Sequence, residues 1–187
     1  MLEIGVVMSF GVLLLRLLVG LTLAAHGSQK LFGALGGSGP TGTSAYFKSL
    51  GFRAPIVMAV MAGLAEFGGG LLFAAGLLTP LAGLAVAVVM LNAIGSEHWD
   101  KGFFNYAGGY EYNLLVLFSA VAVTAIGPGR ASLDHALGWD ASISGAWWGA
   151  GMLVIALVLA AGTLTLGRTT TSLGTGKVEG GTPSTSA

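Results

Sequence analysis

The sequence predicts an all-α membrane protein, a bundle of about five transmembrane helices. Of its 187 residues, 54% are apolar and only 9% are charged, whereas a soluble domain carries about 25% charged residues. The apolar residues gather in five segments that approach the roughly 20 residues needed to cross the hydrocarbon core of a bilayer. Many of the 32 glycines fall inside these segments, where close packing of membrane helices favours them. These three observations place the chain in lipid.

The expected spans cover residues 6–32, 55–77, 80–95, 112–126 and 146–166, all within one helical bundle at 1–166. Pro55 and Pro80 stand at the start of their segments, in the first helical turn that tolerates proline. The link at 76–80 is so short that the second and third spans are predicted to be antiparallel neighbours. Residues 33–53 and 96–111 are predicted to be polar loops. Residues 167–187, rich in Thr, Ser and Gly, are predicted to be a disordered polar tail.

The distribution of Lys and Arg predicts the orientation of the bundle. Five spans place both polar loops and the C-terminal tail on one side, and that side then carries Lys30, Lys48, Arg53, Lys101, Arg168 and Lys177. The opposite side has only Arg130 outside the membrane. Because positively charged loops favour the cytoplasm, the N-terminus is expected outside and the C-terminus in the cytoplasm.

Composition also argues against several classes of function. The formal net charge is zero, so no electrostatic argument favours nucleic-acid binding. The chain has no cysteine, which removes disulfide exchange, iron–sulfur clusters and thiolate chemistry. Its sequence contains no nucleotide-binding loop and no zinc-ligand spacing. We therefore expect neither a metal site nor an intrinsic cofactor.

Two charged residues fall in the middle of apolar segments. Arg16 interrupts a run of leucines, and Glu66 precedes three glycines at 68–70. Charged side chains in a bilayer normally face the bundle interior, and at about 1.5 Å per residue both lie roughly 15 Å from the same membrane face. The sequence therefore predicts a buried ion pair between Arg16 and Glu66. Such a pair either only fixes helix register or makes Glu66 the protonatable floor of a ligand site.

A group of polar residues is expected near the cytoplasmic face, where the ends of three helices reach the same depth. Together with Glu66, this group is predicted to line a ligand-binding pocket covered by Phe103, Phe104 and Tyr106. The predicted ligand-binding set is His26, Lys30, Glu66, Asn92, His98, Glu111 and Tyr112. Plain anchoring at the membrane interface is the alternative, because Lys, His and Tyr commonly anchor helices without any ligand.

Histidines raise the question of a haem. His26 and His98 could in principle be the axial ligands of a b-type haem. Two histidines are scant evidence for one, so interfacial hydrogen bonding is the favoured role. His135, next to Asp134, lies on the opposite side and is expected in a loop.

Several segments of the chain, taken jointly, resemble the DoxX family of small membrane proteins. They are HGSQKLFG at 26–33, EFGGG at 66–70, GLLTP at 76–80, GYEYNL at 109–114, GPGR at 127–130 and SLD at 132–134. They occur in the family's order and extend over about residues 10–138. The resemblance implies a four-helix transmembrane bundle in a bacterial inner membrane, with the fifth segment as an additional C-terminal transmembrane helix.

The resemblance also implies a redox association, because family members resemble subunits of thiosulfate:quinone oxidoreductase or partners of quinone and catechol detoxification. The leading hypothesis is a membrane subunit of a redox complex that binds a quinone or similar lipophilic ligand near the cytoplasmic face, with electrons supplied by a protein partner. The alternative is a non-catalytic anchor that docks an oxidoreductase. A third, disfavoured hypothesis is a proton-coupled transporter that uses Arg16 and Glu66. Stripes of small residues would also suit a homo-oligomer.

Overall fold

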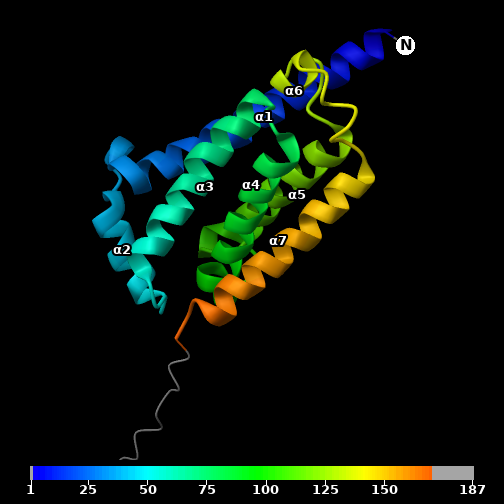
Figure 1. Ribbon diagram of the computed structural model, residues 1–187. Coiled ribbons are helices and arrows are strands. Elements are labelled where there is room, and N and C mark those ends of the chain that lie inside the picture. Colours follow the sequence, from blue (N-terminus) through cyan, green and yellow to red (C-terminus); the bar gives the residue numbers. More distant parts are fainter. Residues whose placement is uncertain (1, 170–187) are drawn as a thin grey trace, which may run out of the picture.

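The computed structural model describes residues 2–169 and shows a bundle of helices (Figure 1). Its α-helices are α1 (Leu2–Phe32), α2 (Gly39–Ser49), α3 (Pro55–Ala75), α4 (Thr79–Ala93), α5 (Glu111–Ile126), α6 (Leu133–Ala136) and α7 (Ala146–Leu166). Short 3-10 or π turns lie at Ala34–Gly36, Ile94–His98, Trp99–Lys101 and Asn105–Ala107. The all-α prediction is confirmed.

Four helices of the described residues are long and apolar enough to cross a membrane: Val7–Phe32, Pro55–Ala75, Thr79–Lys101 and Ala146–Leu166. The apolar helix α5 is shorter, with 16 residues. The predicted third span at 80–95 ends too early, because a π turn and a 3-10 turn continue the helical backbone of α4 to Lys101. Large apolar side chains such as Leu18, Leu115 and Val158 are exposed on the outer faces, as expected where lipid is the solvent.

Helices α1 and α3 approach each other as closely as their backbones allow. A methyl group added at Gly20 would lie 2.5 Å from the Gly70 carbonyl oxygen, and one added at Gly70 would lie 2.5 Å from the Gly20 carbonyl oxygen. Farther along the same contact, Gly27 faces Phe67. Glycine at such positions lets membrane helices pack at short distance. These contacts determine which residues of the two helices lie level with one another.

The other side of the bundle consists of α4, α5 and α7, which pack against one another. Its buried core includes Val86, Met90, Leu117, Val123 and Met152. The link between α3 and α4 is tight, with Gly76 and Leu78 in the left-handed region. It makes α3 and α4 adjacent antiparallel helices, as predicted.

The segment at 33–53, predicted to be a polar loop, contains the helix α2. Pro40 stands in its first turn, where proline is tolerated. Helix α2 packs on both α3 and α1, and Phe52, just beyond it, is buried. The many Gly, Ser and Thr residues of the segment hid this helix, because those residue types are poor helix formers in isolation.

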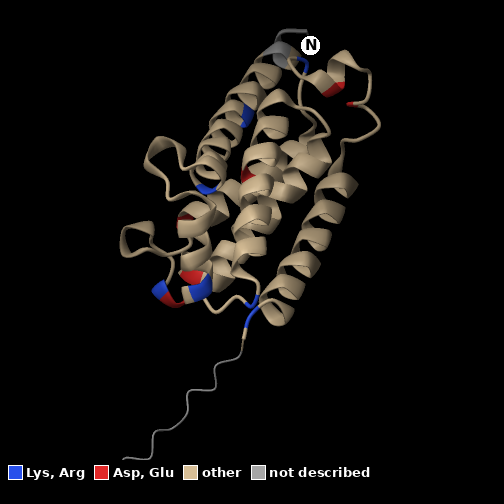
Figure 2. Cartoon of the chain, turned by 60° about the vertical axis from the view of Figure 1, so that its left-hand side comes forward, with Lys and Arg blue, Asp and Glu red and all other residues tan. Residues whose placement is uncertain are grey.

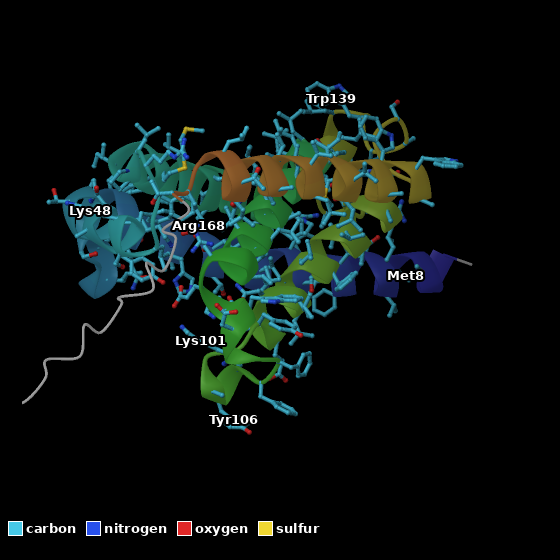
Figure 3. The ribbon with its side chains drawn as sticks, turned by 90° about the horizontal axis from the view of Figure 1, so that it is seen from below. Met8, Lys48, Lys101, Tyr106, Trp139 and Arg168 are labelled. Atoms are coloured by element: carbon cyan, nitrogen blue, oxygen red, sulfur yellow. The ribbon has the colours of Figure 1, made fainter. Side chains whose placement is uncertain are left out.

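The ends of α2, α4 and α7 meet at one end of the molecule. Arg168 donates hydrogen bonds to the carbonyl oxygens of Leu50 (3.0 Å) and Gly95 (3.3 Å). Viewed from below, Lys48, Lys101 and Arg168 lie toward this end, whereas Met8 and Trp139 lie toward the other (Figure 3). The first residues of the predicted polar tail are therefore packed on the bundle. The predicted disorder of 170–187 lies outside the described residues.

Candidate functional site

A buried ion pair joins α1 to α3 near the end of the bundle that carries Lys48 and Arg168. The Lys30 ammonium nitrogen lies 2.5 Å from Oε2 of Glu66, and the two side chains are 25% and 7% exposed. Lys30 stands in the last turn of α1, where a cation also interacts favourably with the helix dipole. The register of the α1–α3 contact brings these two residues together.

The predicted ion pair between Arg16 and Glu66 is wrong. Arg16 lies level with the end of α3, because a methyl group at Gly76 would be 2.6 Å from the guanidinium carbon of Arg16. Glu66 instead lies close to the level of Gly27, whose neighbour across the contact is Phe67. The depth estimate assumed that residues 6 and 77 mark the same membrane surface. The glycine contacts shift α1 along α3 by about three turns relative to that assumption.

Arg16 is completely buried and ties backbone segments together. Its guanidinium donates hydrogen bonds to the carbonyl oxygens of Phe73 (3.2 Å), Ala74 (2.9 Å) and Ala131 (3.0 Å), and to that of Pro128. Carbonyl groups at the end of a helix have no partner within the helix. Arg16 supplies donors to the end of α3 and fastens the loop after α5 to it.

Asp134, in α6, has the matching role at the start of α4. Its carboxylate is fully buried and accepts hydrogen bonds from the backbone N–H groups of Leu78 (2.8 Å) and Thr79 (2.9 Å), and from the Thr79 hydroxyl (2.6 Å). An acidic side chain at a helix N-terminus satisfies free N–H groups and complements the dipole. Sequence reasoning placed Asp134 only in a loop, because this contact spans 55 residues of chain.

A cavity of about 560 Å³ adjoins the Lys30–Glu66 ion pair. This volume lies within the usual range for small-molecule sites. Its walls are largely apolar and come from α1, α3 and α4, with the residues after α2 closing one side. The apolar lining includes Leu23, Phe47, Phe52, Met58, Met61, Val88, Val89 and Met90.

Six of the seven predicted ligand-binding residues line this cavity. They come from four helical segments, and they are His26, Lys30, Glu66, Asn92, His98 and Tyr112. Lining residues that sequence reasoning did not include are Tyr46, Ser96, Glu97, Asn105, Asn113 and Thr163. Tyr46 was missed because α2 was not recognised as a helix. Its aromatic pair with the following residue, Phe47, was a signal for a packed segment.

Glu111 is the exception, because it lies outside the cavity. Its carboxylate accepts a hydrogen bond from the backbone N–H of Asn105 (3.0 Å) and borders a second hollow of about 490 Å³ beside Phe103. Successive residues of a helix point about 100° apart, so Tyr112 can face the cavity while Glu111 cannot. Phe103, Phe104 and Tyr106 do not line the cavity that they were predicted to cover. Tyr106 is 89% exposed and projects away from the bundle (Figure 3).

Hydrogen bonds fix the orientation of two polar groups in the cavity wall. Nδ1 of His98 lies 2.6 Å from the Gly108 carbonyl oxygen, which can only accept, so Nδ1 carries a proton. The side-chain nitrogen of Asn92 donates to the Val88 carbonyl oxygen at 2.9 Å. The side-chain oxygen of Asn92 is buried and has no hydrogen-bond partner among residues 2–169.

Charged groups gather at the outer rim of the cavity, at the lower end of the bundle in Figure 2. Glu97 lies 3.3 Å from the Lys101 ammonium and 3.7 Å from Nε2 of His98. Burial and a hydrogen bond with the Glu97 carboxylate raise the pKa of Tyr46 above its usual range. Tyr46 is therefore a neutral hydroxyl at physiological pH. Among the described residues, no group of three or more His, Asp or Glu side chains is arranged to hold a metal ion.

Comparisons with known proteins point to one family. The DoxX family model matches residues 11–99. The chain is 30% identical over 124 residues to "Putative oxidoreductase CatD" of Bacillus subtilis, covering 66% of this chain and 84% of that protein. It is 32% identical over 145 residues to "Uncharacterized membrane protein Rv3486" of Mycobacterium tuberculosis, covering 72% and 86% respectively. No solved structure is a significant match.

Replacing Lys30 with Met should destabilise the bundle, because it leaves the buried Glu66 carboxylate without its cation. We expect the free energy of unfolding to fall by about 2 kcal/mol. The double variant Lys30→Met/Glu66→Gln should recover part of that loss, since no buried charge remains. Denaturant titration of helicity in detergent micelles measures both effects.

Lys101→Met is the matched control for this prediction. It removes a more exposed pair, with side chains 44% and 31% exposed for Lys101 and Glu97, and should change stability by less than about 0.5 kcal/mol. Equal effects of Lys30→Met and Lys101→Met would contradict the role given to the buried pair.

Proposed function

This chain belongs to the DoxX family of multi-pass membrane proteins, and we propose that it binds a quinone or similar lipophilic ligand as the membrane subunit of a redox complex. The observation that carries the proposal is the cavity beside Lys30 and Glu66. A quinone has an apolar body with polar oxygens on its ring, so it requires an apolar chamber with a few polar groups. The similarity to a protein named as an oxidoreductase supports a redox association.

The polar groups of the cavity suit the head group of such a ligand. Lys30 and the Tyr112 hydroxyl supply donors to ring oxygens. Glu66 is the acid placed to accept or release a proton, a role that the sequence had suggested for Glu111. The apolar walls, with Met58 and Met61 among them, accommodate the rest of the ligand, since methionine adapts to irregular ligand shapes.

The electron donor is assigned to a protein partner. The chain has no cysteine to hold an iron–sulfur cluster and no nucleotide-binding loop for a flavin or nicotinamide. The loop that follows α4 offers the partner a surface, with Trp99, Phe104 and Tyr106 exposed. If the chain is only an anchor, this loop would dock the partner and the cavity would hold no quinone.

The cavity is proposed to lie near the cytoplasmic face. Lys48, Lys101 and Arg168 lie toward the cavity end of the bundle (Figure 3). Arg130 stands beyond α5, in the loop that Arg16 fastens to the end of α3. The positive-inside rule then gives an external N-terminus and a cytoplasmic C-terminus.

Photo-crosslinking with an azido-quinone in purified, lipid-reconstituted protein tests the ligand. We expect label in peptides that contain residues 23–30, 58–66 and 88–98. Glu66→Gln should reduce labelling at least about fivefold, because it removes the charge that holds Lys30 at the polar end of the cavity. Glu111→Gln, an equivalent change outside the cavity, should leave labelling intact. Label confined to residues outside the cavity, or an equal response of both variants, would refute quinone binding here and leave the anchor function.

Single cysteines test the orientation, since the natural chain has none to interfere. We expect Tyr106→Cys to react with a membrane-impermeant maleimide only after the cells are permeabilised. Ser142→Cys, exposed at the opposite end, should react in intact cells. The reverse pattern of labelling would place the cavity near the outer face.

A further inference from the structure

The Asn92 side chain has an orientation that the structure determines. Its amide nitrogen lies 2.9 Å from the Val88 carbonyl oxygen one turn earlier in α4. A carbonyl oxygen can only accept, so the nitrogen must face it. Exchanging the two amide atoms would bring two acceptors together. The side-chain oxygen of Asn92 therefore points away from its own helix backbone.

This oxygen is a buried acceptor without a donor. It has no hydrogen-bond partner among residues 2–169, and Asn92 lines the cavity beside Lys30 and Glu66. Buried polar atoms are nearly always hydrogen-bonded, and an unpaired one is costly. An unpaired acceptor in a cavity wall thus indicates that the occupant carries a donor.

The remaining polar groups of the cavity shift the balance further toward acceptors. Glu66 uses one oxygen for Lys30, and a carboxylate offers about four acceptor positions in total. Two lining donors are already committed to backbone carbonyl oxygens: Nδ1 of His98 to Gly108 (2.6 Å) and the Thr163 hydroxyl to Leu159 (2.8 Å). Hydroxyl groups such as that of Tyr112 can both donate and accept, so they favour neither kind of ligand.

On the basis of the function proposed above, we propose that the cavity selects the reduced, hydroxyl-bearing form of its ring ligand. The oxygens of a quinone can only accept hydrogen bonds, whereas both hydroxyl groups of a hydroquinone can donate. One hydroxyl donates to the side-chain oxygen of Asn92, and the Glu66 carboxylate is the second acceptor in the same wall. The quinone leaves the Asn92 oxygen unpaired.

The preference has an electrochemical consequence. One buried hydrogen bond gained, with one unpaired acceptor avoided, corresponds to about a tenfold difference in Kd between the two forms. Tighter binding of the reduced form raises the midpoint potential of the bound couple by about 30 mV per tenfold for two electrons. The cavity then makes its bound quinone easier to reduce than the same quinone free in the bilayer.

Equilibrium binding to the full chain in nanodiscs tests this selection. The probes are a decyl-tailed benzoquinone and its hydroquinone, the latter kept reduced without oxygen. We expect the hydroquinone to bind about tenfold more tightly. Asn92→Leu should bring the two Kd values within about twofold of each other, mainly by weakening the hydroquinone. A redox titration of the bound couple on the natural chain gives the same test without a variant.

Thr124→Val is the matched control. The Thr124 hydroxyl is also buried without a partner among the described residues, but it does not line the cavity, so this variant should keep the tenfold preference. Equal binding of both forms by the natural chain overturns the selection and leaves quinone binding standing, as does a preference that persists in Asn92→Leu. Binding of neither probe overturns the proposed function itself.

Discussion

The close contact between α1 and α3 determines the position of the polar groups in this bundle. Where Gly20 meets Gly70, no side chain separates the two backbones, so the helices cannot slide past one another without a clash. This one register gives both charged residues of the first segment their partners. Lys30 meets Glu66, and Arg16 meets the carbonyl oxygens at the end of α3. Both charges are thereby satisfied away from lipid, which is the condition for keeping them in a membrane helix.

The two ends of the bundle use their polar groups differently. At one end, Arg16 and Asp134 spend their hydrogen bonds on backbone groups and hold the links between helices in place. At the other end, Lys30 and Glu66 lie beside a cavity, and Asn92 presents an acceptor that the protein does not use. The first arrangement is closed and stabilising. The second has spare hydrogen-bonding capacity and space, which are the properties of a site for a ligand.

Sequence reasoning predicted the class of fold and most of the candidate site, for identifiable reasons. Apolar segment length and glycine content follow directly from the bilayer, and the short link at 76–80 forces adjacent helices. Titratable residues near helix ends reach a common depth whatever the packing, so Lys30, Asn92 and His98 could be grouped. The level of Glu66 relative to Arg16 could not be predicted, because small-residue stripes show which faces meet but not how far the helices are shifted. The outward direction of Glu111 and the contact of Asp134 with Thr79 likewise depend on tertiary packing.

A disulfide between α1 and α3 measures that shift directly. A methyl group at Gly63 would lie 2.7 Å from Cγ of Leu31, so cysteines at these two positions have the Cβ separation of about 3.5–4.5 Å that a disulfide needs. The account predicts that Leu31→Cys/Gly63→Cys forms an intramolecular disulfide on mild oxidation of the folded protein. The register of an Arg16–Glu66 pair would separate the two cysteines by about 18 Å along the helix. Two thiols that stay free in the folded monomer would contradict the α1–α3 contact and the site that depends on it.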